Sequence, residues 1–124
     1  MGTEGSVYLW SDDPEVGRRA LAEVFSEAER IDRLMSTYKD ESEISEINRD
    51  AATQPVAASE ELFTLIQRSL DISVLTRGAF DITYDSVGQH YDCRERQRPD
   101  EKLVESERAN IDYRLVTLNR AAGT

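Results

Sequence analysis

The clearest apolar periodicity in the chain follows Pro14. Asp13 is typical of a helix N-cap, and proline is favoured at the first helical position. Apolar side chains then recur at steps of three and four, at Val16, Ala20, Val24, Ala28, Ile31 and Met35, and are joined by Leu21, Phe25 and Leu34. This pattern predicts a long amphipathic helix that ends near Ser36-Thr37-Tyr38.

Two further helices are predicted downstream. Asp40 with Glu43 resembles a capping box, which favours a short helix burying Ile44 and Ile47. Ser59 resembles the N-cap of a longer helix, whose expected core face carries Leu62, Ile66, Leu70 and Val74. Gly78 suits the left-handed position that ends this helix.

Three β-rich runs separate or flank the helices. Residues 7–10 are expected to form an opening strand, the alternation in residues 80–84 predicts a half-buried strand, and residues 113–118 read as a closing strand. Pro99-Asp100 is expected to start a helix that runs to about Ala109. This element order leaves the α/β and α+β classes both open.

Length and charge narrow the function classes. A chain of 124 residues is the size of one domain, and 15 basic against 25 acidic residues give a net charge of -10, which disfavours nucleic acid. The single cysteine, Cys93, cannot form an internal disulfide, and the single histidine, His90, is expected at the surface. No run is apolar enough to cross a bilayer and no leader is recognisable, so we expect a cytoplasmic protein.

Three segments gather small, hydroxyl and aromatic residues where regular elements meet turns, as loop-borne binding sites do. They are Met1-Gly2-Thr3, the run from Met35 to Ser42, and Thr76 to Thr83. Packing offers an alternative explanation, in which Gly2 and Gly78 serve turns, Tyr38 closes a helix and Asp81 caps or solvates a strand.

The order and content of these segments resemble successive motifs of the ApbE family, the FAD:protein FMN transferases. The matching runs are Met-Gly-Thr, Ser-Thr-Tyr, Asp-Glu-Ser-Glu-Ile-Ser-Glu-Ile-Asn and Thr-Arg-Gly-Ala-Phe-Asp-Ile-Thr, with weaker likeness at Pro99-Asp100-Glu101 and from Asp112 to Val116. The resemblance implies an α+β fold with a mixed sheet and packed helices, similar to the T-fold. Residues 1–124 would form the amino-terminal part of such a domain, which would be incomplete relative to the family.

The resemblance also implies an activity. The family cleaves the pyrophosphate of FAD, releases AMP and attaches FMN through a phosphoester to a threonine of a target flavoprotein subunit, with Mg²⁺ as the expected metal. Carried over by motif, Met1 would touch the nucleotide, Tyr38 would offer its ring to the isoalloxazine, and Ala79, Phe80 and Asp81 would line the FAD site. An aromatic face can stack on a flat flavin, and a carboxylate can accept hydrogen bonds from adenine or ribose.

The family pattern is only partly present. Relatives continue into a glycine-rich Asp-Leu-Gly-Gly segment with a lysine and a later Asp and Thr group that holds magnesium, and they are often exported or membrane-anchored. We find neither segment here, so we assign no catalytic residue and no metal ligand, and the run after Thr83 also departs from the family. The alternatives are a non-catalytic flavin-binding module and an interaction domain that binds no nucleotide.

Overall fold

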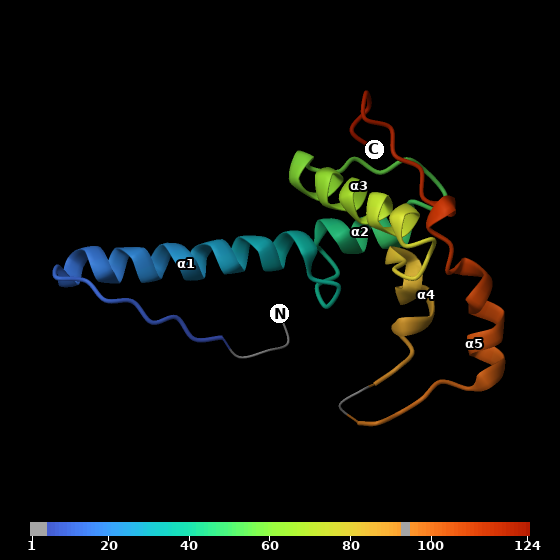
Figure 1. Cartoon of the computed structure of the whole chain (residues 1–124), viewed down its shortest axis with the longest axis horizontal. Coiled ribbons are helices and arrows are strands. Elements are labelled where there is room, and N and C mark those ends of the chain that lie inside the picture. The colour runs from blue at the N-terminus through green and yellow to red at the C-terminus, as the bar shows by residue number, and fades with distance from the viewer. Residues whose placement is uncertain (1–4, 93–94) are drawn as a thin grey trace. The chain divides into compact units, whose positions relative to one another are not determined.

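The computed structural model describes residues 5–92 and 95–124, and all regular elements in these ranges are helical (Figure 1). The chain divides into two compact units, Met1–Ala58 and Ser59–Thr124. The first unit holds α1 (Pro14–Met35) and α2 (Glu43–Asp50). The second holds α3 (Glu60–Leu75), η1 (Ile82–Tyr84), α4 (Asp85–Gly88), α5 (Glu101–Glu107), η2 (Arg108–Asn110) and η3 (Tyr113–Leu115).

The predicted long helix is confirmed as α1. The carboxylate of Asp13 accepts hydrogen bonds from the backbone N–H groups of Glu15, at 2.8 Å, and Val16, at 3.4 Å. Two of the helix's otherwise unpaired donors are thereby satisfied, and Pro14 needs none. The helix ends at Met35, and Ser36 is its extended C-cap.

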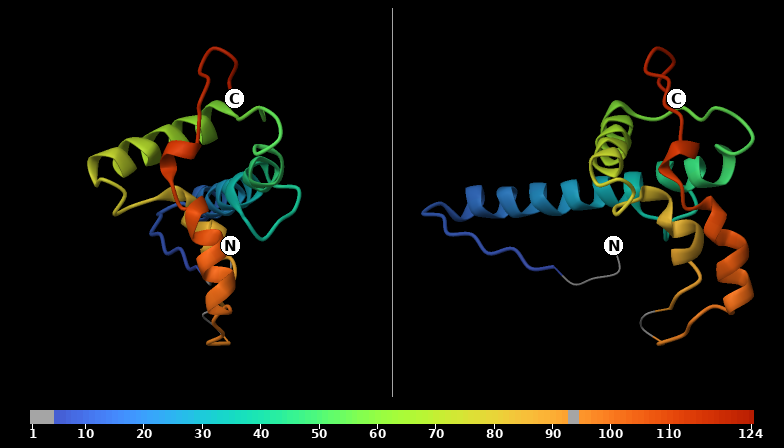
Figure 2. Two further views of the ribbon diagram at one scale, coloured as in Figure 1. Left: turned by 90° about the vertical axis from the view of Figure 1, so that its right-hand side faces the viewer. Right: turned by 45° about the vertical axis from the view of Figure 1, so that its right-hand side comes forward.

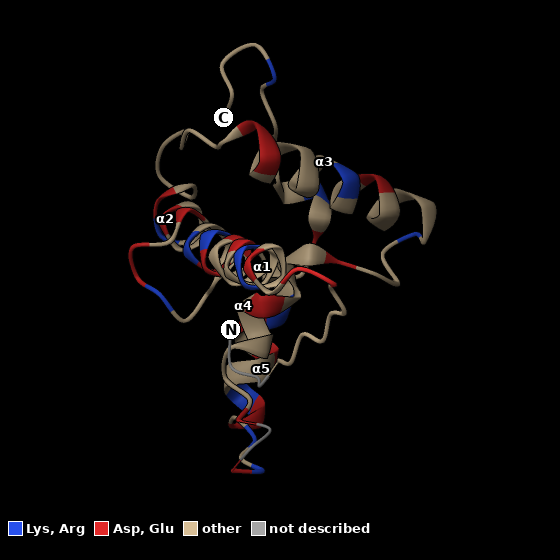
Figure 3. Cartoon of the chain, turned by 90° about the vertical axis from the view of Figure 1, so that its left-hand side faces the viewer, with Lys and Arg blue, Asp and Glu red and all other residues tan. Residues whose placement is uncertain are grey.

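The apolar stripe of α1 is substantially open to solvent. Val16, Val24 and Phe25 remain 46%, 45% and 52% exposed. Acidic and basic positions are interspersed along the same helix (Figure 3), and Glu15–Arg18 and Glu27–Arg30 form ion pairs one turn apart. The helix therefore has strong local support, from its cap and surface pairs, and little burial over its first half.

The short second helix is confirmed, but its cap is not the predicted one. Ser42, rather than Asp40, is the N-cap of α2, and its hydroxyl accepts the N–H of Ser45 at 3.2 Å. Ile44 and Ile47 are half-buried. Ser42 itself is 1% exposed, so a compact hydroxyl fits this position where a solvated carboxylate would be costly.

The third predicted helix is confirmed as α3, with Ser59 as N-cap and Leu62 fully buried. Ile66 and Leu70 are half-buried, whereas Val74, expected on the core face, is 61% exposed. Gly78 lies just beyond the helix with φ +82°, in the left-handed region, and its N–H donates to the Ser73 carbonyl at 2.9 Å. The helix itself ends at Leu75, and the left-handed position directly after its C-cap, Thr76, is taken by Arg77 with φ +55°, so the stop lies close to the predicted place but is made one residue before Gly78.

The remainder of the second unit is built from short helical pieces. Figure 2 shows α4 and α5 as neighbours, and α4 contacts η1, α5 and η2. Asp100 caps α5 through the N–H of Lys102 at 2.8 Å, which confirms the predicted helix start.

The predicted α+β fold with a mixed sheet is wrong for the residues that the structure describes. Residues 7–10 have no regular structure, and η1 and η3 occupy residues 82–84 and 113–115 of the other two predicted strands. An isolated bridge between Asp92 and Gln97 is the sole β pairing in the described ranges. The aspartates that precede η1 and η3 accept the backbone N–H two residues later in the chain. These local hydrogen bonds stabilise a turn in each segment and compete with the pairing that a strand needs.

The second unit has a small apolar core. Leu62 and Phe63 are each 2% exposed and Val87 is 4% exposed. The guanidinium of Arg120 lies 5.0 Å from the ring centroid of Phe63, within cation–π range, and reaches Glu60 at 3.6 Å. The carboxyl-terminal segment is thus fastened to the first turn of α3.

Candidate functional site

Tyr38 is the candidate flavin contact in the first unit. It follows the end of α1, in the turn before α2, and its side chain is 84% exposed. Its backbone N–H lies 3.4 Å from Ser36 Oγ. A ring that is held by its backbone and left open to solvent can stack on a planar ligand without displacing core residues.

Three serines shape this turn. The hydroxyl of Ser42 donates to the Ser36 carbonyl at 2.7 Å, while the hydroxyls of Ser42 and Ser45 lie 2.9 Å apart. Lys39, next to Tyr38, forms a 2.6 Å ion pair with Asp32. The ammonium of Lys39 is the largest cause that holds the pKa of Asp32 at about 2.

Ala79 and Phe80, the candidates in the second unit, lie in a loop whose amides have partners in the chain. The N–H of Ala79 donates to the Thr76 carbonyl at 3.2 Å, and the N–H of Phe80 donates to the Thr76 hydroxyl at 3.1 Å. The amide of Gly78 is also used, as described above. The Phe80 side chain is 42% exposed, so its ring, rather than this row of amides, is what the loop offers to a ligand.

The Asp81 carboxylate is engaged by the chain's own donors. Oδ1 accepts the N–H of Thr83 at 2.9 Å and the Thr83 hydroxyl at 2.7 Å. Oδ2 accepts the N–H of Tyr113 at 2.9 Å. Since a carboxylate offers about four acceptor directions, one direction on Oδ2 remains for another donor.

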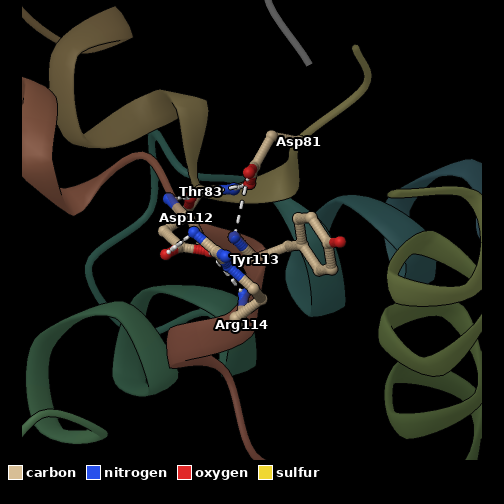
Figure 4. A network of polar contacts seen from close by, with 5 residues as sticks. All are labelled: Asp81, Thr83, Asp112, Tyr113 and Arg114. Carbon is tan, nitrogen blue, oxygen red and sulfur yellow. Dashed lines mark hydrogen bonds and ion pairs between the residues drawn. The ribbon is translucent and has the colours of Figure 1, made fainter. Parts of the chain in front are cut away.

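A second aspartate repeats this local geometry at η3. Asp112 Oδ1 accepts the N–H of Arg114 at 3.0 Å, and its two oxygens receive the Arg114 guanidinium at 2.7 and 2.8 Å. Its own N–H donates to Thr83 Oγ1 at 2.8 Å and to the Asn110 carbonyl at 3.1 Å. Figure 4 shows these groups together.

We call the cross-link formed by Asp81, Thr83, Asp112 and Tyr113 the clasp. Its two long-range bonds, Asp112 N–H to Thr83 Oγ1 and Tyr113 N–H to Asp81 Oδ2, span 29 and 32 residues of sequence. The ring of Tyr113 extends away from the carboxylate (Figure 4), and a Cβ built on Gly78 would lie 3.7 Å from it. Tyr113 therefore bonds the candidate loop at Asp81, and its ring lies next to the space that a side chain at position 78 would enter.

The surroundings of Asp81 and Asp112 favour the ionised form of both carboxyl groups. Partial burial acts to raise the pKa of Asp81, but the hydrogen bonds from Thr83 and Tyr113 outweigh it and hold that pKa below the usual value. The Arg114 guanidinium likewise lowers the pKa of Asp112. Both carboxylates are therefore charged acceptors at neutral pH, which shortens and strengthens their hydrogen bonds.

The structure describes four of the five predicted site residues. Met1 lies outside the described residues. Tyr38 belongs to the first unit, whereas Ala79, Phe80 and Asp81 are consecutive in the second. The sequence analysis predicts no role for Thr83 or Tyr113. The Asp-Ile-Thr and Asp-Tyr-Arg runs are nevertheless typical of an aspartate whose side chain accepts the backbone N–H two residues later.

No group of three or more His, Cys, Asp or Glu side chains in the described ranges is arranged to hold a metal ion. The described residues thus offer no such cluster of ligands, and the Mg²⁺ implied by the resemblance stays a prediction. Within the same ranges, no helix is both long and apolar enough to span a membrane.

Comparison with known proteins gives consistent relatives. The ApbE family model matches residues 1–124. A protein of Vibrio cholerae called FAD:protein FMN transferase is 31% identical over 101 residues, which cover 81% of this chain and 30% of the relative. Proteins of the same name from Klebsiella pneumoniae and Chlamydia muridarum are 35% and 25% identical, covering 67% and 86% of this chain but 24% and 34% of their own lengths.

The chain spans about a quarter to a third of the length of these curated relatives. The match nevertheless runs from the opening Met-Gly-Thr segment through the Tyr38 turn and the clasp. On this evidence the chain belongs to the ApbE family.

Proposed function

We propose that this chain supplies part of the FAD site of an FAD:protein FMN transferase. In the proposed reaction a threonine hydroxyl of a target protein attacks the FMN phosphorus of FAD. The anhydride bond breaks so that AMP leaves with the bridging oxygen, the threonine proton passes to solvent, and FMN remains attached through a phosphoester. The observation that carries the proposal is the family match along residues 1–124, together with relatives named for this activity.

The chain's own contribution is binding and orientation of the nucleotide. Tyr38 would place its exposed ring on the isoalloxazine, Phe80 would add an apolar contact, and Asp81 would offer the acceptor direction left on Oδ2. Such positioning is the larger part of what a protein contributes to phosphoryl transfer. Ala79, being small, would leave room for the ligand beside Phe80, and Met1 would add a further contact.

The magnesium expected of the family would supply charge stabilisation at the phosphates. We assign no step to it here because the described residues offer no cluster of ligands for it. The acceptor threonine belongs to the proposed partner, a target flavoprotein subunit.

Calorimetric titration with FAD, with and without magnesium, tests the proposal. We expect the wild-type chain to bind, and Tyr38→Ala to weaken binding by about two- to tenfold because one aromatic stacking contact is lost. Tyr8→Ala is the matched control, since Tyr8 is also an exposed tyrosine of the first unit, at 81%, and should leave affinity unchanged. Absence of heat in both conditions would overturn the proposal, while binding that ignores magnesium would favour a flavin-binding module.

A further inference from the structure

The hydroxyl of Thr83 occupies a central place in the second unit. It donates to Asp81 Oδ1 at 2.7 Å and accepts the N–H of Asp112 at 2.8 Å. The Thr83 oxygen thus joins Asp81 to the backbone of Asp112, which lies 29 residues after Thr83. A hydroxyl can do both at once because it carries one donor and two acceptor sites.

The bonds around Asp81 leave its carboxylate little freedom. Thr83 holds Oδ1 through two donors, and the N–H of Tyr113 holds Oδ2. The Asp81 side chain is consequently fixed in both position and rotation. The remaining acceptor direction on Oδ2 is therefore fixed as well. A carboxylate in this state binds a donor without the entropy loss of ordering a free side chain.

The same contacts fix the loop before Asp81. The Thr76 carbonyl and hydroxyl accept the amides of Ala79 and Phe80 at one end, and the N–H of Tyr113 donates to Asp81 at the other. Phe80 is held between these two anchors while its side chain stays 42% exposed. The loop is therefore pre-organised by residues that do not themselves present groups to the ligand.

We propose that Thr83 is a positioning residue for the nucleotide site, which sets the orientation of the Asp81 carboxylate and of Phe80 through the clasp. The inference rests on the proposed function, since it concerns how that site is held. The inference adds the backbone N–H groups of Asp112 and Tyr113 to the site. They would hold Thr83 and Asp81 in place without contacting the ligand.

Replacing the hydroxyl tests this role. Thr83→Val keeps the shape of the side chain and removes both of its hydrogen bonds, so we expect FAD affinity to fall about tenfold. Thr83→Ser keeps the hydroxyl and should retain affinity within about twofold. Thr64→Val, at an exposed threonine of α3 in the same unit, controls for the substitution itself and should bind like the wild type.

A ligand-free measurement separates the clasp from FAD binding. Hydrogen exchange at the amides of Asp112 and Tyr113 should be slow in the wild type and Thr83→Ser, and faster in Thr83→Val. Equal FAD affinity in Thr83→Val and the wild type would overturn the positioning role and leave the proposed function standing. Loss of affinity in Thr83→Ser to the level of Thr83→Val would also overturn it. If the wild type fails to bind FAD, the proposed function and the positioning role both fall, although slow exchange would still report the clasp.

Discussion

The turn that carries Tyr38 and the loop that carries Phe80 are held in different ways. Around Tyr38, the hydrogen bonds join Ser36, Ser42 and Ser45, which lie within nine residues of one another. Around Phe80, local bonds to Thr76 are joined by the clasp, in which the amides of Asp112 and Tyr113 donate to acceptors 29 and 32 residues earlier in the chain. The first turn is a local structure that α1 and α2 can form by themselves, whereas the second loop needs the chain to return from beyond α5.

This difference has an energetic consequence. Local hydrogen bonds require little loop closure, so losing one removes about its own contribution. The clasp closes a long loop and anchors several groups at once, so loss of one member leaves the others with unpaired donors. We therefore expect substitutions in the clasp to cost more than equivalent substitutions in the serine turn.

Removing the Asp81 side chain should have the largest effect on folding. Asp81→Ala deletes the acceptor of three hydrogen bonds and leaves the N–H groups of Thr83 and Tyr113 without it. We expect the free energy of unfolding to fall by about 2–3 kcal/mol, measured by urea denaturation. Asp71→Ala is the control, at an exposed aspartate of α3 that accepts one hydrogen bond from Gln67. It should lower the free energy of unfolding by about 0.5 kcal/mol or less. Equal losses in the two variants would contradict the clasp.

Removing the Ser42 hydroxyl should cost less. Ser42→Ala deletes the N-cap hydrogen bond of α2 and the hydrogen bond to the Ser36 carbonyl. Both of these bonds join residues that are close in sequence. The expected loss is about 1 kcal/mol in the same denaturation experiment. Ser26→Ala, at an exposed position inside α1, is the control and should be neutral or slightly stabilising because alanine favours helix. A loss in Ser42→Ala as large as in Asp81→Ala would remove the contrast between the two regions.

The same contrast explains which features the sequence could predict. The starts of α1, α3 and α5 follow from a local signal, an Asp or Ser side chain that bonds amides two or three residues on, and those predictions are confirmed. The cap of α2 was misassigned because Asp40 and Ser42 both fit the local pattern, and only burial separates them.

The predicted strands failed for a related reason. Alternation in residues 80–84 indicates a strand only if another segment provides the ladder, and no sequence pattern guarantees that partner. In the described structure Asp81 and Asp112 bond their own following amides, and the two turns then bond each other. The spacing Asp-Ile-Thr was visible in the sequence, but the pairing of Thr83 with Asp112 was not.

Two aspartates with lowered pKa values allow the most direct test, because their causes differ. The ion pair with Lys39 is the largest of the causes that lower the pKa of Asp32 to about 2, whereas hydrogen bonds from Thr83 and Tyr113 lower the pKa of Asp81 from 3.8. Each depressed pKa contributes stability that is present above the unfolded value and is lost as the pH falls through the folded value. Both carboxylates are half-buried, but the Lys39 ammonium that pairs with Asp32 is 40% exposed, so salt should weaken this ion pair more than it weakens the hydrogen bonds to Asp81.

The decisive measurement is an NMR titration of the Asp32 and Asp81 carboxyl groups at low salt and at about 1 M salt, where the screening length is about 3 Å. The clasp predicts a pKa of Asp81 below 3.8 in both conditions, with a shift of the Tyr113 amide resonance at the same midpoint, while the pKa of Asp32 rises toward 3.8 in high salt. An Asp81 carboxyl that titrates at 3.8, or whose titration leaves the Tyr113 amide unmoved, would contradict the clasp.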